Sequence, residues 1–166
     1  MAAYQYGIQG DRAPEWGVET WFNLPGEKQR LDLSDFSNTV IYLYCFQSWC
    51  PGCHSHGFPT LLNVMEQFQE SSDVAFVAVQ TVFEGFEVNT AERARETAEK
   101  YQLTIPVGHD SGPDGRRSLI MPRYRTGGTP WAIVIDSKGT VRYNDFRADA
   151  YQMTDLINQL RRSANE

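Results

Sequence analysis

The sequence predicts an α/β fold with a mixed central sheet, because three apolar patterns follow one another along the chain. Residues 40–46 (VIYLYCF) and 74–79 (VAFVAV) are continuous apolar runs, which are typical of strands buried on both faces of a sheet. A helical pattern separates them, so the two strands should be parallel and joined by a right-handed crossover. Residues 131–135 and 140–143 instead predict two strands joined by a tight turn. With 166 residues, the chain is long enough for one well-buried domain.

The first part of the chain has a different composition from the rest. Residues 1–38 are rich in glycine, proline and aspartate, and their apolar pieces are short. We interpret them as an N-terminal extension with room for one hairpin. The core of the domain is then expected over residues 39–162.

A first helix is expected directly after the first buried strand. Apolar residues recur at intervals of three and four over residues 58–68, which predicts a helix from the region of Cys50 to about Gln69. Pro51 fits a first helical turn. Pro59 lies inside the pattern and is expected to kink the helix.

The remaining elements follow from weaker patterns. A charged helix over residues 91–101 has few apolar positions and should lie on the surface, as an insertion after the second strand. Residues 105–107 predict a short edge strand, and residues 112–125 predict a loop with a short helix near residues 118–124. A closing helix with one apolar face is predicted over residues 151–161.

The charge balance argues against nucleic acid and membranes as partners. The 15 lysine and arginine residues face 21 aspartate and glutamate residues, a formal net charge of −6, which would repel phosphate groups overall. No run approaches the roughly 18 apolar residues of a membrane helix. The exception is a local basic stretch formed by Arg116, Arg117, Arg123 and Arg125. We expect a solvated loop there, with contact to an acidic partner protein as the alternative.

Cys50 and Cys53 carry the most specific chemical signal in the sequence. A thiol in the first turn of a helix meets unpaired backbone N–H groups and the positive end of the helix dipole, which lower its pKa. Cys50 is therefore placed to act as a nucleophile. Cys53 lies about one helical turn further along, close enough to attack a mixed disulfide formed at Cys50. The spacing predicts dithiol–disulfide exchange.

Three other interpretations of this pair are open. Two inert core cysteines are one, although a Cys-x-x-Cys that follows a buried strand and opens a helix is the specific setting of a redox pair. With His54, the motif also matches the attachment site of a c-type haem, which requires export and a cavity framed by helices. A zinc site that recruits His54 or His56 would need further ligands, and Cys45 and His109 do not form a second pair. Dithiol chemistry is favoured over all three.

Three short motifs occur in the order typical of one known family. They are residues 44–53 (YCFQSWCPGC), 10–14 (GDRAP), and 128–130 (GTP) just before an apolar strand. Together they resemble the thioredoxin superfamily over about residues 10–160. The sequence is most similar to the TlpA/ResA-type thiol–disulfide oxidoreductases, with the peroxiredoxins as more distant relatives. The resemblance implies a three-layer α/β/α sandwich with a mixed central sheet, an N-terminal extension and an inserted helix.

The resemblance implies a role for each matching residue. Cys50 would be the attacking thiol and Cys53 the resolving thiol, with Trp49 packed beside them. Pro130 would be a cis-proline that faces the disulfide, and a cis X-Pro bond costs only about 1 kcal/mol. The backbone of Thr129 would then be free to pair with an extended substrate peptide. A trans proline at the start of a strand is the alternative.

The sequence also departs from the family. Thioredoxins carry a buried aspartate six residues before the first cysteine, and here that position is Tyr44, so the usual base is missing. Some TlpA/ResA-type enzymes use a glutamate just after the next strand; Glu84 is the candidate here, and an exposed loop carboxylate is the alternative. His54 could stabilise a thiolate or simply lie on the surface. Cys45 is expected to be a small buried apolar residue. The order Pro-Gly between the two cysteines is reversed from thioredoxin, so the reduction potential does not transfer.

The predicted function is reversible disulfide exchange with protein substrates. An upstream dithiol donor would supply electrons, and neither an organic cofactor nor a metal is expected. A peroxiredoxin-like peroxidase is an alternative, although the segment before Cys50 lacks the Pro-x-x-x-Thr-x-x pattern of a peroxidatic cysteine. A binding module that keeps the fold without turnover is a second alternative. The first twelve residues show no secretory pattern, so we expect a cytoplasmic location, or an extracytoplasmic one if a leader has been removed.

Overall fold

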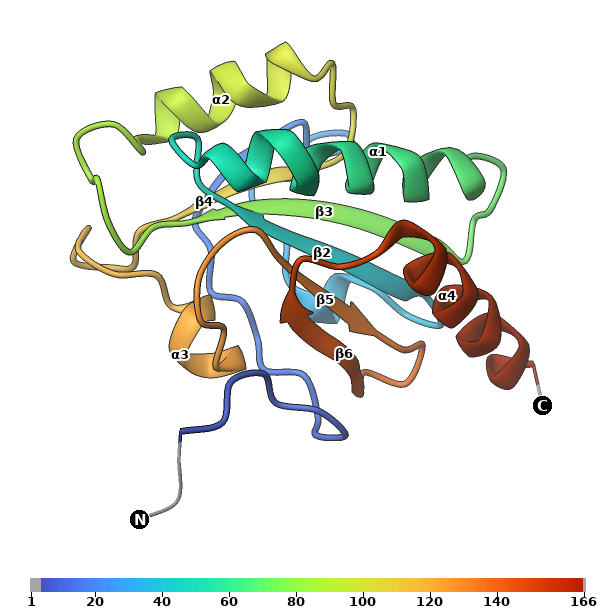
Figure 1. The fold of residues 1–166 in the computed structure, drawn as a ribbon. Coiled ribbons are helices and arrows are strands. Elements are labelled where there is room, and N and C mark those ends of the chain that lie inside the picture. Colours follow the sequence, from blue (N-terminus) through green and yellow to red (C-terminus); the bar gives the residue numbers. More distant parts are fainter. Residues whose placement is uncertain (1–3, 166) are drawn as a thin grey trace.

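A six-stranded mixed sheet organises residues 4–165, which are the residues described by the computed structural model (Figure 1). The strands are β1 (Thr20–Phe22), β2 (Val40–Phe46), β3 (Val74–Thr81), β4 (Val107–Asp110), β5 (Trp131–Ile135) and β6 (Val141–Phe146). Their order across the sheet is β1-β4-β3-β2-β5-β6. β3 is parallel to both β2 and β4, whereas β5 is antiparallel to β2, β6 to β5, and β1 to β4. The predicted mixed sheet is therefore confirmed.

Helical segments are divided unevenly between the two faces of the sheet. They are η1 (Leu33–Asp35), η2 (Cys53–Gly57), α1 (Phe58–Gln67), α2 (Ala91–Lys100), α3 (Ile120–Tyr124) and α4 (Ala150–Ala164). The helices α1, α2 and α4 pack on one face, and the short α3 and the N-terminal segment pack on the other (Figure 1). The three predicted layers are present, with the N-terminal segment supplying much of the third.

The strand β2 lies at the centre of both cores. All seven of its residues are buried, as a continuous apolar run predicts. Alternate side chains of a strand point to opposite faces. Tyr42 and Tyr44 therefore join the core under α1 and α4, while Leu43 and Cys45 join the core under α3 and the N-terminal segment. The end of β2, from which the Cys-x-x-Cys motif emerges, is fixed from both sides.

The helix after this motif is interrupted where Pro59 predicts a kink, and the interruption is a π-helical turn. Residues 53–57 form η2, and α1 begins only at Phe58. Pro59 lies in the first turn of α1, directly after η2, and because proline has no N–H it cannot donate a hydrogen bond to the preceding turn. The helix ends at Gln67, two residues before its predicted end.

Two predictions for the far edge of the sheet are wrong. The sequence predicts an edge strand over residues 105–107, but β4 begins at Val107 and is not at the edge, because β1 pairs with its outer side. The hairpin expected in the N-terminal extension is not found in residues 4–38, since β1 pairs with β4 instead of a near neighbour in sequence. Gly108 permits this docking, because a Cβ there would lie 3.0 Å from the ring of Trp21.

The other elements lie where the sequence predicts them, with small shifts. The helix α2 begins at Ala91, where the side chain of Thr90 accepts a hydrogen bond from the N–H of Arg93 at 3.2 Å. The predicted short helix near residues 118–124 is α3. The strand β3 is two residues longer than predicted and ends with Gln80 and Thr81. These added residues carry Gln80 to the functional site.

Candidate active site

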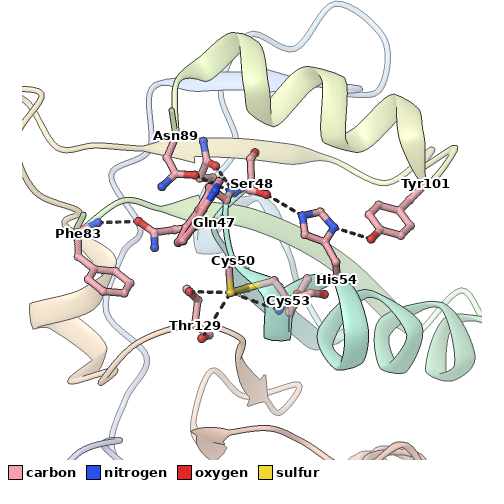
Figure 2. Close-up of a disulfide and its surroundings, with 12 residues drawn as sticks. Gln47, Ser48, Cys50, Cys53, His54, Phe83, Asn89, Tyr101 and Thr129 are labelled. Carbon is pink, nitrogen blue, oxygen red and sulfur yellow. Dashed lines mark hydrogen bonds between the residues drawn. A yellow bond between two sulfur atoms is a disulfide. The ribbon is translucent and has the colours of Figure 1, made fainter. Parts of the chain in front are cut away.

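Cys50 and Cys53 form a disulfide at the carboxyl end of β2 (Figure 2). Their Cα atoms are 5.3 Å apart. Cys53 is completely buried and Cys50 is half-buried, so a partner molecule can reach only Cys50. The backbone N–H of Cys53 donates to Sγ of Cys50 at 3.2 Å. The same contact would stabilise a thiolate on that sulfur.

The chain just before β5 passes directly beside the disulfide. The Thr129–Pro130 peptide bond is cis, as the resemblance implies. The carbonyl oxygen of Thr129 lies 3.7 Å from Sγ of Cys50, and its Oγ1 lies 3.5 Å from the same sulfur. The motif helix packs closely on this segment, because a Cβ at Gly57 would overlap both the Pro130 ring and the hydroxyl of Tyr44.

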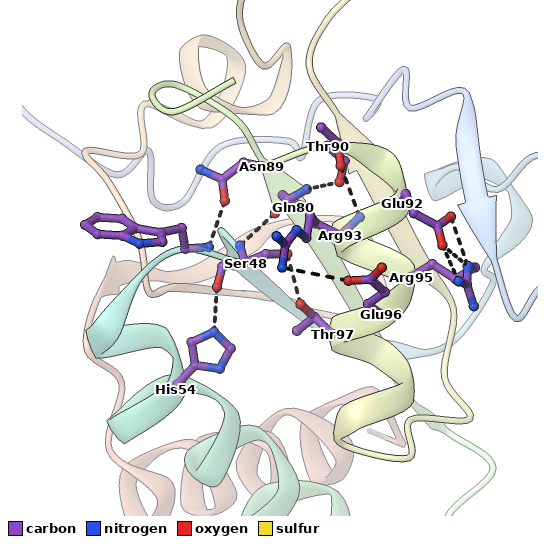
Figure 3. A network of polar contacts seen from close by, with 11 residues as sticks. Ser48, His54, Gln80, Asn89, Thr90, Glu92, Arg93, Arg95, Glu96 and Thr97 are labelled. Carbon is purple, nitrogen blue, oxygen red and sulfur yellow. Dashed lines mark hydrogen bonds and ion pairs between the residues drawn. The ribbon is translucent and has the colours of Figure 1, made fainter. Parts of the chain in front are cut away.

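The loop that joins β2 to the motif is fixed by two buried amides that sequence reasoning misses. The N–H of Ser48 donates to Oε1 of Gln80 at 2.7 Å (Figure 3). The N–H of Trp49 donates to Oδ1 of Asn89 at 2.8 Å. Gln80 is 0% and Asn89 2% exposed. A buried amide oxygen left without a donor costs about 1–3 kcal/mol, so Gln80 and Asn89 hold the loop in the conformation that supplies these N–H groups.

A third buried amide, Gln47, fixes the neighbouring loop. Its Oε1 accepts hydrogen bonds from the N–H of Phe83 at 3.1 Å and of Glu84 at 3.3 Å (Figure 2). A sequence signal exists for two of the three amides. Gln47 and Gln80 are polar residues at the carboxyl ends of two adjacent buried parallel strands, where side chains of different strands meet at one edge.

His54 holds the same loop from the helix side. Its Nε2 lies 2.6 Å from the carbonyl oxygen of Ser48, which can only accept, so this nitrogen carries the hydrogen. Its Nδ1 lies 2.6 Å from the hydroxyl of Tyr101, which donates to it when the imidazole is neutral. The hydroxyl of Ser48 accepts a hydrogen bond from Thr97 at 2.9 Å. Both ring nitrogens of His54 are therefore engaged away from the sulfur atoms.

Gln80 also connects the loop to β4. Its Nε2 donates to the carbonyl oxygen of Thr90 at 3.0 Å and to Nδ1 of His109 at 3.0 Å. An accepting Nδ1 requires a neutral imidazole with its hydrogen on Nε2. Burial lowers the pKa of His109 from its ordinary value of 6.5, against the opposing effect of Asp110. Protonation of His109 would break this contact with Gln80.

A comparison with known protein families assigns the chain to one of them. A family model described as the AhpC/TSA family matches residues 9–144, which run from before β1 into β6 and include the Cys-x-x-Cys motif. The chain belongs to the AhpC/TSA family. This is a redoxin family of the thioredoxin superfamily, so the predicted superfamily is confirmed. No curated protein sequence shows a significant match to the chain.

Solved structures agree with this assignment. A thioredoxin-like superfamily protein is 33% identical, with a TM-score of 0.81 over 90% of this chain and 95% of its own. A thiol-disulfide isomerase from Corynebacterium glutamicum is 30% identical, with a TM-score of 0.77 over 89% of this chain and 96% of its own. The thioredoxin domain of a thiol-disulfide oxidoreductase from Bacteroides vulgatus shares the fold at 19% identity, with a TM-score of 0.64 and coverage of 95% and 99%.

In this AhpC/TSA member, Tyr44 occupies the position of the missing aspartate. Its hydroxyl donates to the carbonyl oxygen of Cys53 at 3.1 Å. Burial raises the pKa of Tyr44 well above its ordinary value of 10.0, so the hydroxyl keeps its proton and cannot replace a carboxylate as base. Burial likewise raises the pKa of the Cys45 thiol. Cys45 is a fully buried core residue, as predicted.

Two predicted site residues, Trp49 and Glu84, are held through their backbones. The indole of Trp49 is 66% exposed. Glu84 is exposed in the loop after β3, and its carbonyl oxygen accepts a hydrogen bond from Nδ2 of Asn89 at 3.0 Å. Within residues 4–165, neither side chain makes a hydrogen bond to Cys50 or Cys53. The structure therefore brings both residues to the rim of the site without joining them to the sulfurs.

The part of the chain that the structure describes offers neither a cluster of metal ligands nor a membrane-spanning helix. Among residues 4–165, no three side chains of the types His, Cys, Asp and Glu are arranged to hold a metal ion. None of the helices in this range has the length and apolar character needed to cross a membrane.

Proposed function

We propose that this AhpC/TSA-family protein is a thiol–disulfide oxidoreductase that exchanges disulfides with protein substrates. The placement of Cys50 carries the proposal: it is the accessible sulfur of the pair, next to the Cys53 N–H and Thr129. The similarity to a thiol-disulfide isomerase from Corynebacterium glutamicum supports the same class of reaction.

The proposed reaction uses both cysteines in sequence. In the reduced protein, the Cys50 thiolate attacks one sulfur of a substrate disulfide, breaks that S–S bond and forms a mixed disulfide. The substrate's leaving sulfur departs as a thiolate and takes a proton from water. The Cys53 thiolate then attacks the Cys50 sulfur, closes the Cys50–Cys53 disulfide and releases the second substrate thiol. Two electrons pass from protein to substrate, and an upstream dithiol donor restores the reduced pair without an organic cofactor.

The segment beside the disulfide would receive the substrate backbone. Thr129 lies against Cys50, Pro130 packs on the motif helix at Gly52 and Gly57, and the N–H of Thr129 has no hydrogen-bond partner among residues 4–165. An extended substrate segment could pair with this backbone as an added strand does. The exposed indole of Trp49 would form the opposite rim.

The second step requires a proton to leave Cys53. Tyr44 keeps its own proton because burial raises its pKa. We propose that Glu84, the exposed carboxylate of the adjacent loop, accepts the Cys53 proton through water. A Glu84→Gln variant should then slow the closing of the disulfide without slowing the first attack, and equal rates for both proteins would contradict this role.

A redox titration tests the proposed function. Alkylation and mass spectrometry would measure the fraction of Cys50–Cys53 disulfide across dithiothreitol and glutathione buffers. A two-electron transition near or below about −270 mV would mark a reductase, and one near about −120 mV an oxidant. Cys45→Ala is the matched control and should not change the transition. The absence of any transition would contradict the proposal.

Two related measurements would favour other functions. Consumption of peroxide that depends on Cys50, at a rate above that of disulfide exchange, would favour a peroxidase. If Cys50→Ser leaves partner binding and biological activity intact, the protein acts as a binding module and exchange is not its function.

A further inference from the structure

A groove of about 370 Å³ reaches Gly127, in the chain segment that leads to Thr129 and the disulfide. Its lining includes Tyr4, Tyr6, Phe83, Arg117, Met121 and Gly127. We call it the Tyr6–Arg117 groove. Gly127 is two residues before Thr129, whose side chain lies 3.5 Å from the Cys50 sulfur. Since successive Cα atoms are about 3.8 Å apart, the groove begins within about 8 Å of the residue that touches the reactive sulfur. Phe83 also lines the groove, and its N–H donates to Oε1 of Gln47, the residue that follows β2, at 3.1 Å (Figure 2).

The N-terminal segment forms one wall of the groove and is firmly held there. The N–H of Gly7 donates to the carbonyl oxygen of Arg125 at 2.7 Å. The ring of Tyr6 lies on Gly127, where a Cβ would approach it to 2.8 Å, and meets Trp131 edge to face at 6.4 Å. Tyr6 nevertheless remains 60% exposed and Tyr4 56% exposed. Fixed aromatic rings that stay open to solvent next to a reactive centre are typical of an interaction surface.

The charge in the groove is unusual for this protein. The chain carries a formal net charge of −6, yet Arg117 is the one charged residue among those that line the groove. Arg117 forms no ion pair with residues 4–165. Arg125 adds a second positive charge close by, at 4.3 Å over the ring of Tyr4. A partner that enters this groove gains from carrying negative charge.

The backbone at the end of the groove is free. Within the described residues, the N–H groups of Gly127, Gly128 and Thr129 have no hydrogen-bond partner. Gly127 is exposed, and the next two residues are half-buried. A chain laid along these residues toward Cys50 would find backbone donors and would bring its neighbouring side chains to Tyr6 and Arg117.

We propose that the Tyr6–Arg117 groove binds the segment of a substrate protein next to its reacting cysteine. The groove selects a large apolar or aromatic side chain, which packs against Tyr6 and Phe83, together with an acidic side chain that faces Arg117. This proposal rests on the proposed function and names its substrate class. The chemistry is the same exchange: the Cys50 thiolate breaks the substrate S–S bond, and Cys53 then closes the protein disulfide, so that two electrons reach the substrate.

Synthetic mixed disulfides can test the selection. Three capped peptides, each disulfide-bonded through its cysteine to 2-mercaptoethanol, would be Gly-Glu-Phe-Cys-Phe-Glu-Gly, Gly-Lys-Phe-Cys-Phe-Lys-Gly and Gly-Glu-Ala-Cys-Ala-Glu-Gly. Their symmetric flanks make the result independent of peptide direction. The rate of oxidation of the reduced full-length protein would be measured with each peptide and with hydroxyethyl disulfide, which has no side chains to place. The Glu-Phe peptide should react about tenfold faster than the Glu-Ala peptide and about fivefold faster than the Lys-Phe peptide.

Variants connect these preferences to the groove. Arg117→Glu should remove or reverse the preference for Glu over Lys, and Arg117→Gln should reduce it. Tyr6→Ala should reduce the preference for Phe over Ala while the Glu preference remains. Arg162→Glu makes the same change of charge at an exposed position of α4 and is the matched control. It should leave both preferences as they are.

The outcomes separate the two proposals. Peptide preferences that respond to Arg117 and Tyr6 support the groove. Three results would contradict the proposed role of the groove: equal rates for all three peptides, a preference for the Lys peptide, or preferences that do not change in these variants. None of them would contradict disulfide exchange itself. Failure of the reduced protein to react even with hydroxyethyl disulfide would overturn the proposed function, and the groove with it.

Discussion

The two chain segments that flank the Cys50–Cys53 disulfide are held in opposite ways. On one side, every polar group of Ser48 is bonded: its N–H to Gln80, its carbonyl oxygen to His54 and its hydroxyl to Thr97. On the other side, the N–H groups of residues 127–129 have no partner within the part of the chain that the structure describes. One segment is fixed by buried side chains, and the other is left open.

This difference assigns different tasks to the two sides. A buried polar network gives its members one conformation, because each lost bond leaves an unsatisfied group. The network around Ser48 therefore sets the position of the attacking sulfur. Unpaired backbone groups at an exposed edge are instead available to a partner. The open segment from Gly127 to Thr129 is thus the place where a substrate chain can add hydrogen bonds without breaking any.

Gly57→Ala should have the largest effect, because it pushes the motif helix away from both β2 and the Pro130 segment. The added methyl group would overlap both the Pro130 ring and the Tyr44 hydroxyl. Overpacking in a closed core costs about 1–3 kcal/mol, and displacement of Pro130 should also slow exchange. Urea unfolding would measure the loss. Ser55→Ala, at an exposed position of the same turn, is the control. Unchanged stability of the Gly57 variant would show that the packing against Pro130 is looser than described.

Gln80→Leu should break the fixed side alone. The change keeps the shape but leaves the part-buried N–H of Ser48 without an acceptor, at a cost of about 1–2 kcal/mol. The exchange rate should fall as well, because the loop before Cys50 loses its support. Chemical unfolding and exchange kinetics measure the two effects. Gln152→Leu on the exposed face of α4 should change neither. A stable, fully active Gln80 variant would contradict the role given to the network.

Thr129→Val should act on the open side and on chemistry more than on stability. It removes the Oγ1 atom that lies 3.5 Å from the Cys50 sulfur while keeping the branched shape. Stability should change by less than about 0.5 kcal/mol. The first attack on hydroxyethyl disulfide should slow about fivefold, because a thiolate loses one hydrogen-bond donor. If stability falls and the rate does not, Thr129 has a structural role only.

His109→Gln should have the smallest effect, which is on how the stability of the protein changes with pH. Burial lowers the pKa of His109 in the folded state below 6.5, so the unfolded chain binds more protons as the pH falls through this range. Stability should therefore decrease as the pH drops below about 6.5. In a His109→Gln variant, the new side-chain amide would still accept from Gln80 without titrating and should flatten this slope. Stability would be measured by urea unfolding at several pH values. If it changes with pH equally in both proteins, protonation of His109 does not affect the stability of the fold.

The sequence predicts the parts of this site that depend on local patterns. The continuous apolar run of β2, the spacing of Cys50 and Cys53, and the motif that ends in Pro130 each lie within a few residues. They lead to the correct central strand and to a confirmed superfamily. The predictions that fail involve partners far apart in sequence. The edge position assigned to residues 105–107 is wrong because β1 reaches it from a segment more than 80 residues earlier.

The fixed side of the site is missed for the same reason. Gln80 reaches Ser48 across 32 positions, and Asn89 reaches Trp49 across 40. The position of Gln80 at the end of a buried strand indicates that its side chain faces the site, but no local pattern shows which distant backbone group it binds. The sequence pattern also does not predict the π-helical turn before Pro59. A proline inside the pattern shows only that the helix is distorted there.

Trapping of the mixed disulfide tests the central claim, that Cys50 is the sulfur that substrates reach and Cys53 the one that releases them. Reduced Cys53→Ser and Cys50→Ser proteins would each be treated with the Glu-Phe peptide disulfide and analysed by mass spectrometry. The Cys53→Ser protein should accumulate one peptide on Cys50, because nothing remains to resolve it. The Cys50→Ser protein should remain unmodified, since Cys53 and Cys45 are buried. Equal trapping on both variants, or trapping on neither, would contradict the account.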